Sequence, residues 1–129
     1  MTMTPEVEQA IAELKETWPD STVTARPDGQ GGAVVFVENV ALFPPYAQDS
    51  TWVGFLLSFQ YPYADVYPHF VRPDLRRTDE KPLGEAMTAG SFDGRPAIQV
   101  SRRSNRHEPE LQTAAIKLHK VLEWMRTRP

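Results

Sequence analysis

The chain has 129 residues and a net charge of -3, with 40% hydrophobic and 24% charged residues, which is the composition of one globular domain with a buried core. It contains no cysteine, which excludes disulfides, thiolate metal sites, thiol nucleophiles and thioester chemistry. No apolar run approaches the roughly 20 residues of a membrane-spanning helix, and the acidic N-terminus is not typical of a secretory signal. We therefore expect a single domain over residues 1–129, located in the cytoplasm.

The N-terminal segment predicts a helix. Thr4 offers a capping hydroxyl, and Pro5 suits the first helical position. Apolar residues then recur every three or four positions, at Val7, Ile11, Leu14 and Trp18. Trp18-Pro19-Asp20 ends this helix.

A series of strands follows the helix. Val23–Arg26 is a short strand candidate before a glycine-rich turn. Ala33–Phe43 is rich in β-forming residues but is bent at Glu38-Asn39. Thr51–Gln60 alternates apolar and mixed positions, and Phe70-Val71 is a very short strand. Strands joined by short connections predict an antiparallel meander of three or four strands.

The last third of the chain predicts a loop and a helix. Arg72–Gly94 is polar with no stable period, which indicates a long ordered loop, and Ala97–Ser101 is a short extended segment. Pro109–Arg126 has a helical apolar stripe. The predicted fold class is therefore α+β, with an N-terminal helix, a three- to four-stranded antiparallel meander, a long loop and a C-terminal helix.

A stiff aromatic corner lies between the clearest strand and the short one. Tyr61-Pro62 and Tyr67-Pro68 each fix a backbone angle and hold the preceding residue extended. Such a segment cannot form a regular hairpin, but it can pack over the edge of the sheet and present a surface.

The motifs after the third strand resemble those of the ubiquitin-conjugating enzyme (UBC) fold and its RWD relatives. The closer likeness is to the prokaryotic ubiquitin-conjugating-enzyme-like family E. It rests on the order and spacing of Tyr61, Pro62, Tyr63, Ala64, Pro68, Phe70, Pro73, Asp74, Leu75, Arg76, Ser101 and Arg102. The likeness extends over about Val53 to Glu123.

The resemblance implies a function without the usual chemistry. Members of the superfamily carry a ubiquitin-like protein on a cysteine, and by resemblance Ala97 or Ile98 lies near that position. We expect an inactive or atypical member that binds a ubiquitin-like protein or a partner enzyme in a bacterial conjugation pathway. Such bacterial pathways are often linked to phage defence.

An alternative is an enzyme of the same fold that forms a serine ester. Ser101 or Ser104 would carry the ester, His107 would act as base, and neighbouring arginines would stabilise an oxyanion. The simpler interpretation, which we favour, is that these are solvated loop residues before a helix, where serine and arginine are common. Ser91 is a further serine of the same kind.

Seven arginines fall within residues 72–106, whereas the first twenty residues hold five acids and one lysine. If the fold brings them together, they form a basic face for an acidic protein, a carboxylate tail or phosphates. The predicted binding residues are Tyr61, Pro62, Tyr67, Pro68, His69, Arg72, Arg95, Arg102, Arg103 and Arg106. A third possibility is therefore a small chaperone-like or nucleic-acid-binding module, although the acidic pI of 5.6 makes protein the better partner.

No cofactor or metal site is expected. The three histidines are widely separated, and no cysteine assists them. We interpret His69 as a strand-edge residue and Asp74 as a turn residue. The aromatic residues interpreted as core are Trp18, Phe55, Phe59 and Trp124.

Overall fold

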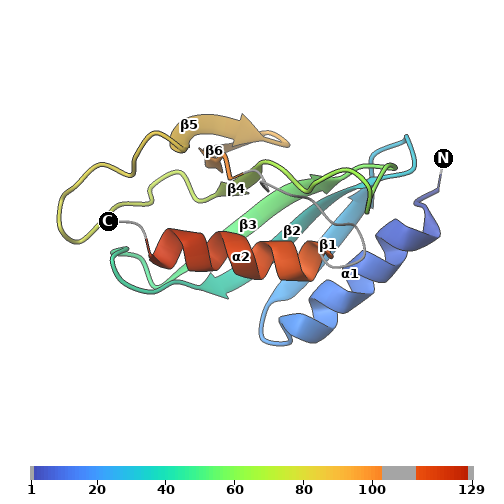
Figure 1. The fold of residues 1–129 in the computed structure, drawn as a ribbon, viewed down its shortest axis with the longest axis horizontal. Helices are drawn as coiled ribbons and strands as arrows, with labels where there is room; N and C mark the ends of the chain where they lie inside the picture. Colours follow the sequence, from blue (N-terminus) through green and yellow to red (C-terminus); the bar gives the residue numbers. More distant parts are fainter. Residues whose placement is uncertain (1, 103–112, 128–129) are drawn as a thin grey trace.

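The computed structural model of the chain describes residues 2–102 and 113–127. One six-stranded antiparallel sheet is formed by strands that lie, in the sequence, between helix α1 (Pro5–Thr17) and helix α2 (Ala114–Arg126) (Figure 1). The strands are β1 (Thr22–Pro27), β2 (Ala33–Ala41), β3 (Ser50–Leu57), β4 (His69–Val71), β5 (Met87–Phe92) and β6 (Arg95–Val100). Their order across the sheet is β1-β2-β3-β4-β6-β5.

The predicted α+β class with two terminal helices and a meander is confirmed, but the sheet is larger than predicted. β1 to β4 pair in chain order, whereas β6 pairs with β4 and β5 forms the edge. The expected loop Arg72–Gly94 therefore contains a strand. Its sequence, MTAGSF, lacks the apolar alternation of a half-buried strand because four of its residues are exposed on an edge.

Both helix starts follow the expected capping chemistry. The Thr4 hydroxyl accepts a hydrogen bond from the Val7 amide at 3.2 Å, and Pro5 occupies the first turn of α1. In α2 the cap is Thr113, whose hydroxyl accepts from the Ile116 amide at 3.3 Å. The stretch 109–112 of the predicted helix lies outside the described residues.

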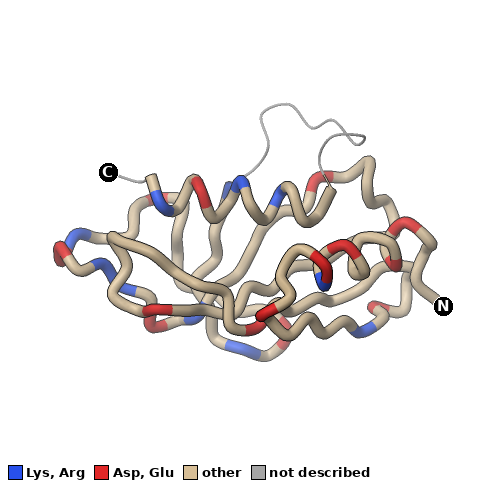
Figure 2. Tube along the Cα trace, turned by 90° about the horizontal axis from the view of Figure 1, so that it is seen from below, with Lys and Arg blue, Asp and Glu red and all other residues tan. Residues whose placement is uncertain are grey.

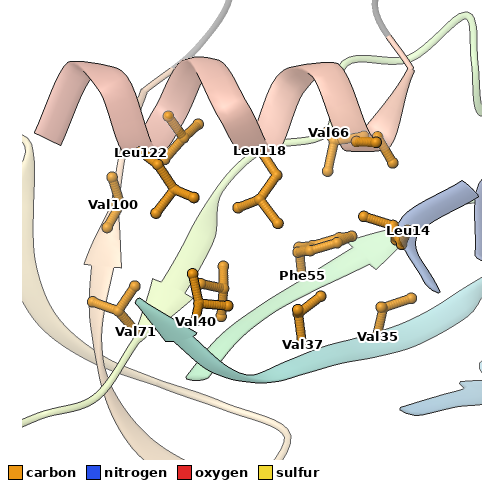
Figure 3. Close-up of a cluster of buried hydrophobic side chains, with 14 of the residues drawn as sticks. Leu14, Val35, Val37, Val40, Phe55, Val66, Val71, Val100, Leu118 and Leu122 are labelled. Atoms are coloured by element: carbon orange, nitrogen blue, oxygen red, sulfur yellow. The ribbon is translucent and has the colours of Figure 1, made fainter. Parts of the chain in front are cut away.

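The main core lies between the two helices and one face of the sheet (Figure 3). Val35, Val37, Phe55 and Val71 from the sheet meet Leu14 of α1 and Leu118 and Leu122 of α2. The strands place these residues on one face because alternate side chains point the same way. The predicted break at Glu38-Asn39 is confirmed, since the register of β2 and β3 shifts between Val37 and Val40.

The face of the sheet without helices carries a second, aromatic cluster. Phe36 and Phe70 lie in register with Gly54 on either side, and both are largely buried. The Phe92 ring contacts both rings, with centroids 5.5 Å from Phe36 and 4.7 Å from Phe70. An added Cβ at Gly54 would lie 2.9 Å from the Phe92 ring, so the glycine makes room for it.

The tip of the β5–β6 hairpin, residues 92–95, covers this aromatic cluster. Asp93 and Gly94 have φ values of 49° and 79° and form a two-residue turn of the hairpin type. Arg95 places its guanidinium 3.8 Å from the Phe36 ring centroid and forms an ion pair with Glu38 at 2.9 Å. Asp93 pairs with Arg26, so the tip reaches the first strand of the sheet.

Neither described helix has the length and apolar content needed to span a bilayer.

Candidate binding surface at the Tyr-Pro corner

The corner comprises Phe59–Pro68 and joins β3 to β4. The peptide bonds Tyr61-Pro62 and Tyr67-Pro68 are both cis. Two successive turns and bends carry the chain from the end of one strand to the start of its neighbour without a hairpin. The prediction that this segment is not a regular hairpin is therefore confirmed.

Tyr61 anchors the corner to the second helix. Its side chain is 7% exposed, and its hydroxyl accepts a hydrogen bond from the Ala114 amide at 2.9 Å. Burial raises the pKa of Tyr61, so the hydroxyl stays protonated. Tyr61 therefore satisfies one of the amides that a helix leaves unpaired at its start, and it is a structural residue more than a contact residue.

A buried ion pair fixes the other end of the corner. Asp65 lies 3.1 Å from the ammonium group of Lys117, whose side chain is 3% exposed. Burial lowers the pKa of Lys117, while the hydrogen bond to Asp65 opposes that shift. Val66 enters the main core (Figure 3). Together with Val66, the Asp65–Lys117 pair holds the corner against α2.

His69 is the first residue of β4, but its side chain is buried in the sheet, so its prediction as a binding residue is wrong. β4 is paired on both sides, with β3 and with β6, and His69 is 0% exposed. Neither ring nitrogen has a hydrogen-bond partner among the described residues. Burial, with Lys117 nearby, lowers the pKa of His69 to about 3, and Asp65 only partly offsets this. His69 therefore cannot contact a partner protein at the surface.

The corner exposes two aromatic side chains. Phe59 is 55% exposed and Tyr63 is 79% exposed, and with Gln60 and Ala64 they line a hollow of about 420 Å³. The interpretation of Phe59 as core is wrong, because β3 ends at Leu57 and the alternation no longer applies. Phe55 is core, whereas Trp18 and Trp124 are only partly buried against it.

A second hollow, of about 350 Å³, lies between α1 and the corner. Its lining includes Glu6 and Glu13 of α1, together with Tyr61 and Pro62. Glu13 also accepts a hydrogen bond from the Thr113 hydroxyl at 2.6 Å. Acidic residues are distributed along α1 itself (Figure 2), so the corner lies beside a negatively charged helix. We call the exposed pair Phe59 and Tyr63, together with this second hollow between α1 and the corner, the corner surface.

The described arginines do not gather into one basic face. Arg72 and Arg77 each form a two-bonded pair with a nearby aspartate, Asp74 and Asp79. Arg95 lies on the helix-free face of the sheet, whereas Arg102 lies 5.8 Å from the Trp124 ring of α2. Basic residues are accordingly scattered in Figure 2. Arg103 and Arg106 lie outside the described residues.

The serine proposed as a nucleophile has no described base beside it. The Ser101 hydroxyl accepts a hydrogen bond from the Gln99 amide group at 3.2 Å, which places it with Gln99 on the helix-free face. His69 is paired opposite Val100 and points to the other face. Ser104 and His107 lie outside the described residues. Ser91 is exposed on β5.

The position expected to match the catalytic cysteine is also closed. Ala97 is 2% exposed within β6 and lies opposite Gly90 of β5. Its neighbour Ile98 is opposite Val71 of β4. The side chain at position 97 is therefore packed within the sheet and is not open to a substrate.

Sequence reasoning missed the two residues that the corner exposes most. The motif includes Tyr63 but does not indicate that it is exposed. For Phe59 a signal is present, because the polar residues Ser58 and Gln60 flank it after the strand. The Asp65–Lys117 pair had no local signal, because the two residues are 52 positions apart.

Comparisons with protein-family models, with curated proteins and with solved structures find no match to this chain. Among the described residues, no three side chains of the kinds that bind metal ions gather in one place.

Proposed function

We propose that the chain is a protein-binding domain without transfer chemistry, which holds a ubiquitin-like protein or one of its partner enzymes at the corner surface. The observation that carries this proposal is the exposure of Phe59 and Tyr63 on a segment whose own anchors are buried. Aromatic side chains are enriched at the centres of protein interfaces, and a rigid loop loses little entropy when it binds.

The position of the corner supports the expected class of partner. It lies between the third and fourth strands of a meander that follows an N-terminal helix, which is where the resemblance to the UBC and RWD folds puts its Tyr-Pro turn. The bacterial conjugation pathway and its link to phage defence follow from that resemblance alone.

The chemistry of the corner surface also indicates which side chains a partner would present. Phe59 and Tyr63 offer apolar area, while Glu6 and Glu13 add negative charge at the neighbouring hollow. A complementary partner presents an apolar side chain beside a lysine or arginine. This differs from the acidic partner that the arginine-rich segment predicted, because the described arginines there are paired or dispersed.

The test is binding of purified ubiquitin-like protein and of its activating enzyme, from the same organism, by isothermal titration calorimetry. We expect Phe59→Ala and Tyr63→Ala each to weaken binding by about 10- to 30-fold, which corresponds to roughly 1.4–2 kcal/mol for an interface anchor. Thr24→Ala, an exposed position on β1, is the matched control and leaves affinity unchanged.

Two other variants and the salt dependence of binding separate the alternatives. Ser101→Ala should leave binding intact, and no hydroxylamine-sensitive adduct should form on the wild-type chain. An adduct that disappears in Ser101→Ala would establish the serine enzyme instead. Loss of binding in Arg102→Glu, with Tyr63→Ala unaffected, would move the interface to the arginine-rich segment. Affinity for nucleic acid that falls linearly with the logarithm of salt concentration would favour the third class.

A further inference from the structure

β5 forms one edge of the sheet, and its outer side pairs with no strand in the described part of the chain. Thr88, Ala89, Gly90 and Ser91 are all exposed. The strand is regular, since its six residues pair with β6 in unbroken register. An edge of this kind presents backbone donors and acceptors to any strand that can align with it.

The hydrogen-bond pattern identifies the outward groups. Phe92 and Arg95 flank a two-residue turn and therefore exchange hydrogen bonds, as do alternate pairs further along the hairpin. The amide of Ser101 donates to the carbonyl of Ala86, just before β5, at 2.7 Å. This bond confirms that the backbone N–H and C=O groups of the even-numbered residues of β5 point toward β6. The N–H and C=O groups of Ala89 and Ser91 therefore point away from the sheet.

The two edges of the sheet differ in their protection. β1 carries the charged Arg26 and ends in Pro27, both of which discourage pairing with another strand. β5 has no charged residue and no proline. Two copies of this strand can approach each other without repulsion between like charges.

We propose that β5 is the interface of a homodimer, in which two copies of the strand pair antiparallel about a two-fold axis and join the sheets. A two-fold axis is the symmetry by which identical strands pair antiparallel. Gly90 faces its own counterpart, so Ala89 of each chain exchanges hydrogen bonds with Ser91 of the other. This register satisfies every outward group of both residues. Centring on Ala89 would instead oppose Ser91 to Met87, whose amide already donates to Gly84.

The absence of cysteine makes a direct test possible. Gly90 has no positive φ, and an added Cβ there would meet Gln99 at an ordinary 3.7 Å, so Gly90→Cys fits the monomer. In the proposed register the two Cα atoms form a non-hydrogen-bonded pair, about 4.5 Å apart, which a disulfide can span. Thr24→Cys on β1 is the control at the other edge of the sheet.

We expect Gly90→Cys to give a covalent dimer under mild oxidation, while Thr24→Cys stays largely uncrosslinked. Wild-type protein should sediment with the mass of two chains. Ala89→Pro removes one outward N–H without touching the bonds to β6, and should halve the sedimenting mass, whereas Ala89→Val keeps the N–H and the dimer. Circular dichroism and thermal unfolding check that each variant is folded.

The proposal is overturned if wild-type protein sediments as a single chain at all concentrations. It is equally overturned if Gly90→Cys crosslinks no faster than Thr24→Cys. Binding of an extended peptide to β5 of a single chain would assign the edge to another protein. None of these results bears on the corner surface, which lies at the end of β3.

Discussion

His69 is a titratable side chain in an apolar core. Its ring centroid lies 5.1 Å from that of Phe55, and the charged groups that act on it are Lys117 and Asp65. The folded protein holds it neutral, with a pKa of about 3, whereas the unfolded chain binds a proton near pH 6.5. Because the folded pKa is depressed, stability is fully present above pH 6.5 and falls as the pH drops toward 3.

The residue gives a prediction for acid stability. Between pH 6 and 4, His69 should remove about 1.4 kcal/mol from the free energy of unfolding for each pH unit. His69→Leu deletes two unpaired ring nitrogens and should be at least as stable as wild type at pH 7. Its advantage should widen as the pH falls, measured by urea unfolding at each pH.

A buried, non-titrating neighbour provides the control for His69. Val71→Ala on the same strand should lower stability by the same amount at every pH. A gap between His69→Leu and wild type that stays constant from pH 7 to pH 4 would show that His69 is not the titrating group.

Single residues also show where sequence reasoning stops. The capping pair Thr4 and Pro5 was predictable because helix ends follow local chemistry. The burial of His69 was not predictable, because β4 becomes a central strand only when β6 pairs with it. The residue of β6 opposite His69 is Val100, 31 positions further along the chain. Non-local pairing leaves no trace in a local pattern.

Among the elements, α2 begins at a junction of three segments. Thr113 caps the helix and donates to Glu13 of α1, and the Ala114 amide donates to Tyr61 of the corner. The corner surface therefore depends on contacts that also fix the start of a helix, so its shape is set by the core and not by the loop alone.

Tyr61→Phe tests this junction. Removing the hydroxyl leaves the Ala114 amide buried and unpaired, which should cost about 1–3 kcal/mol of unfolding free energy. The matched control is Tyr63→Phe, since Tyr63 is 79% exposed and should not change the urea midpoint. Equal midpoints for the two variants would mean that water satisfies the amide and that the junction is not closed.

The β5–β6 hairpin was not predicted from the sequence, although a signal for it existed. Asp93-Gly94 is a dipeptide typical of two-residue hairpin turns, and extended residues lie on both sides of it. The prediction failed because the strand before the turn has no alternating apolar residues that would indicate a strand.

For the molecule as a whole, the sheet separates two cores of unequal size. The larger lies under both helices, and the smaller consists of Phe36, Phe70 and Phe92 under the hairpin tip. The α+β class was predictable from helical and strand periods, but the smaller core was not, because three aromatic residues far apart in sequence meet over a glycine.

The smaller core can be tested by a pair of substitutions. Phe92→Ala should destabilise the protein by about 2–4 kcal/mol, and Gly54→Ala by about 1–3 kcal/mol, because its Cβ meets the Phe36 and Phe92 rings. Combined, the two should cost less than their sum, since the shortened side chain vacates space for the Cβ. Strict additivity in thermal unfolding would show that Phe92 does not rest on Gly54.

The hairpin tip has a consequence for the tolerance of β3 to substitution. A sheet covered on one face permits variation at every second residue, but at Trp52 and Gly54 the outward positions of β3 lie beneath or beside the tip. Leu56, the next outward position, is 43% exposed. A short turn thus acts as a third layer, and in the middle of β3, at Trp52 and Gly54, the residues that face away from the helices are constrained like those that face them.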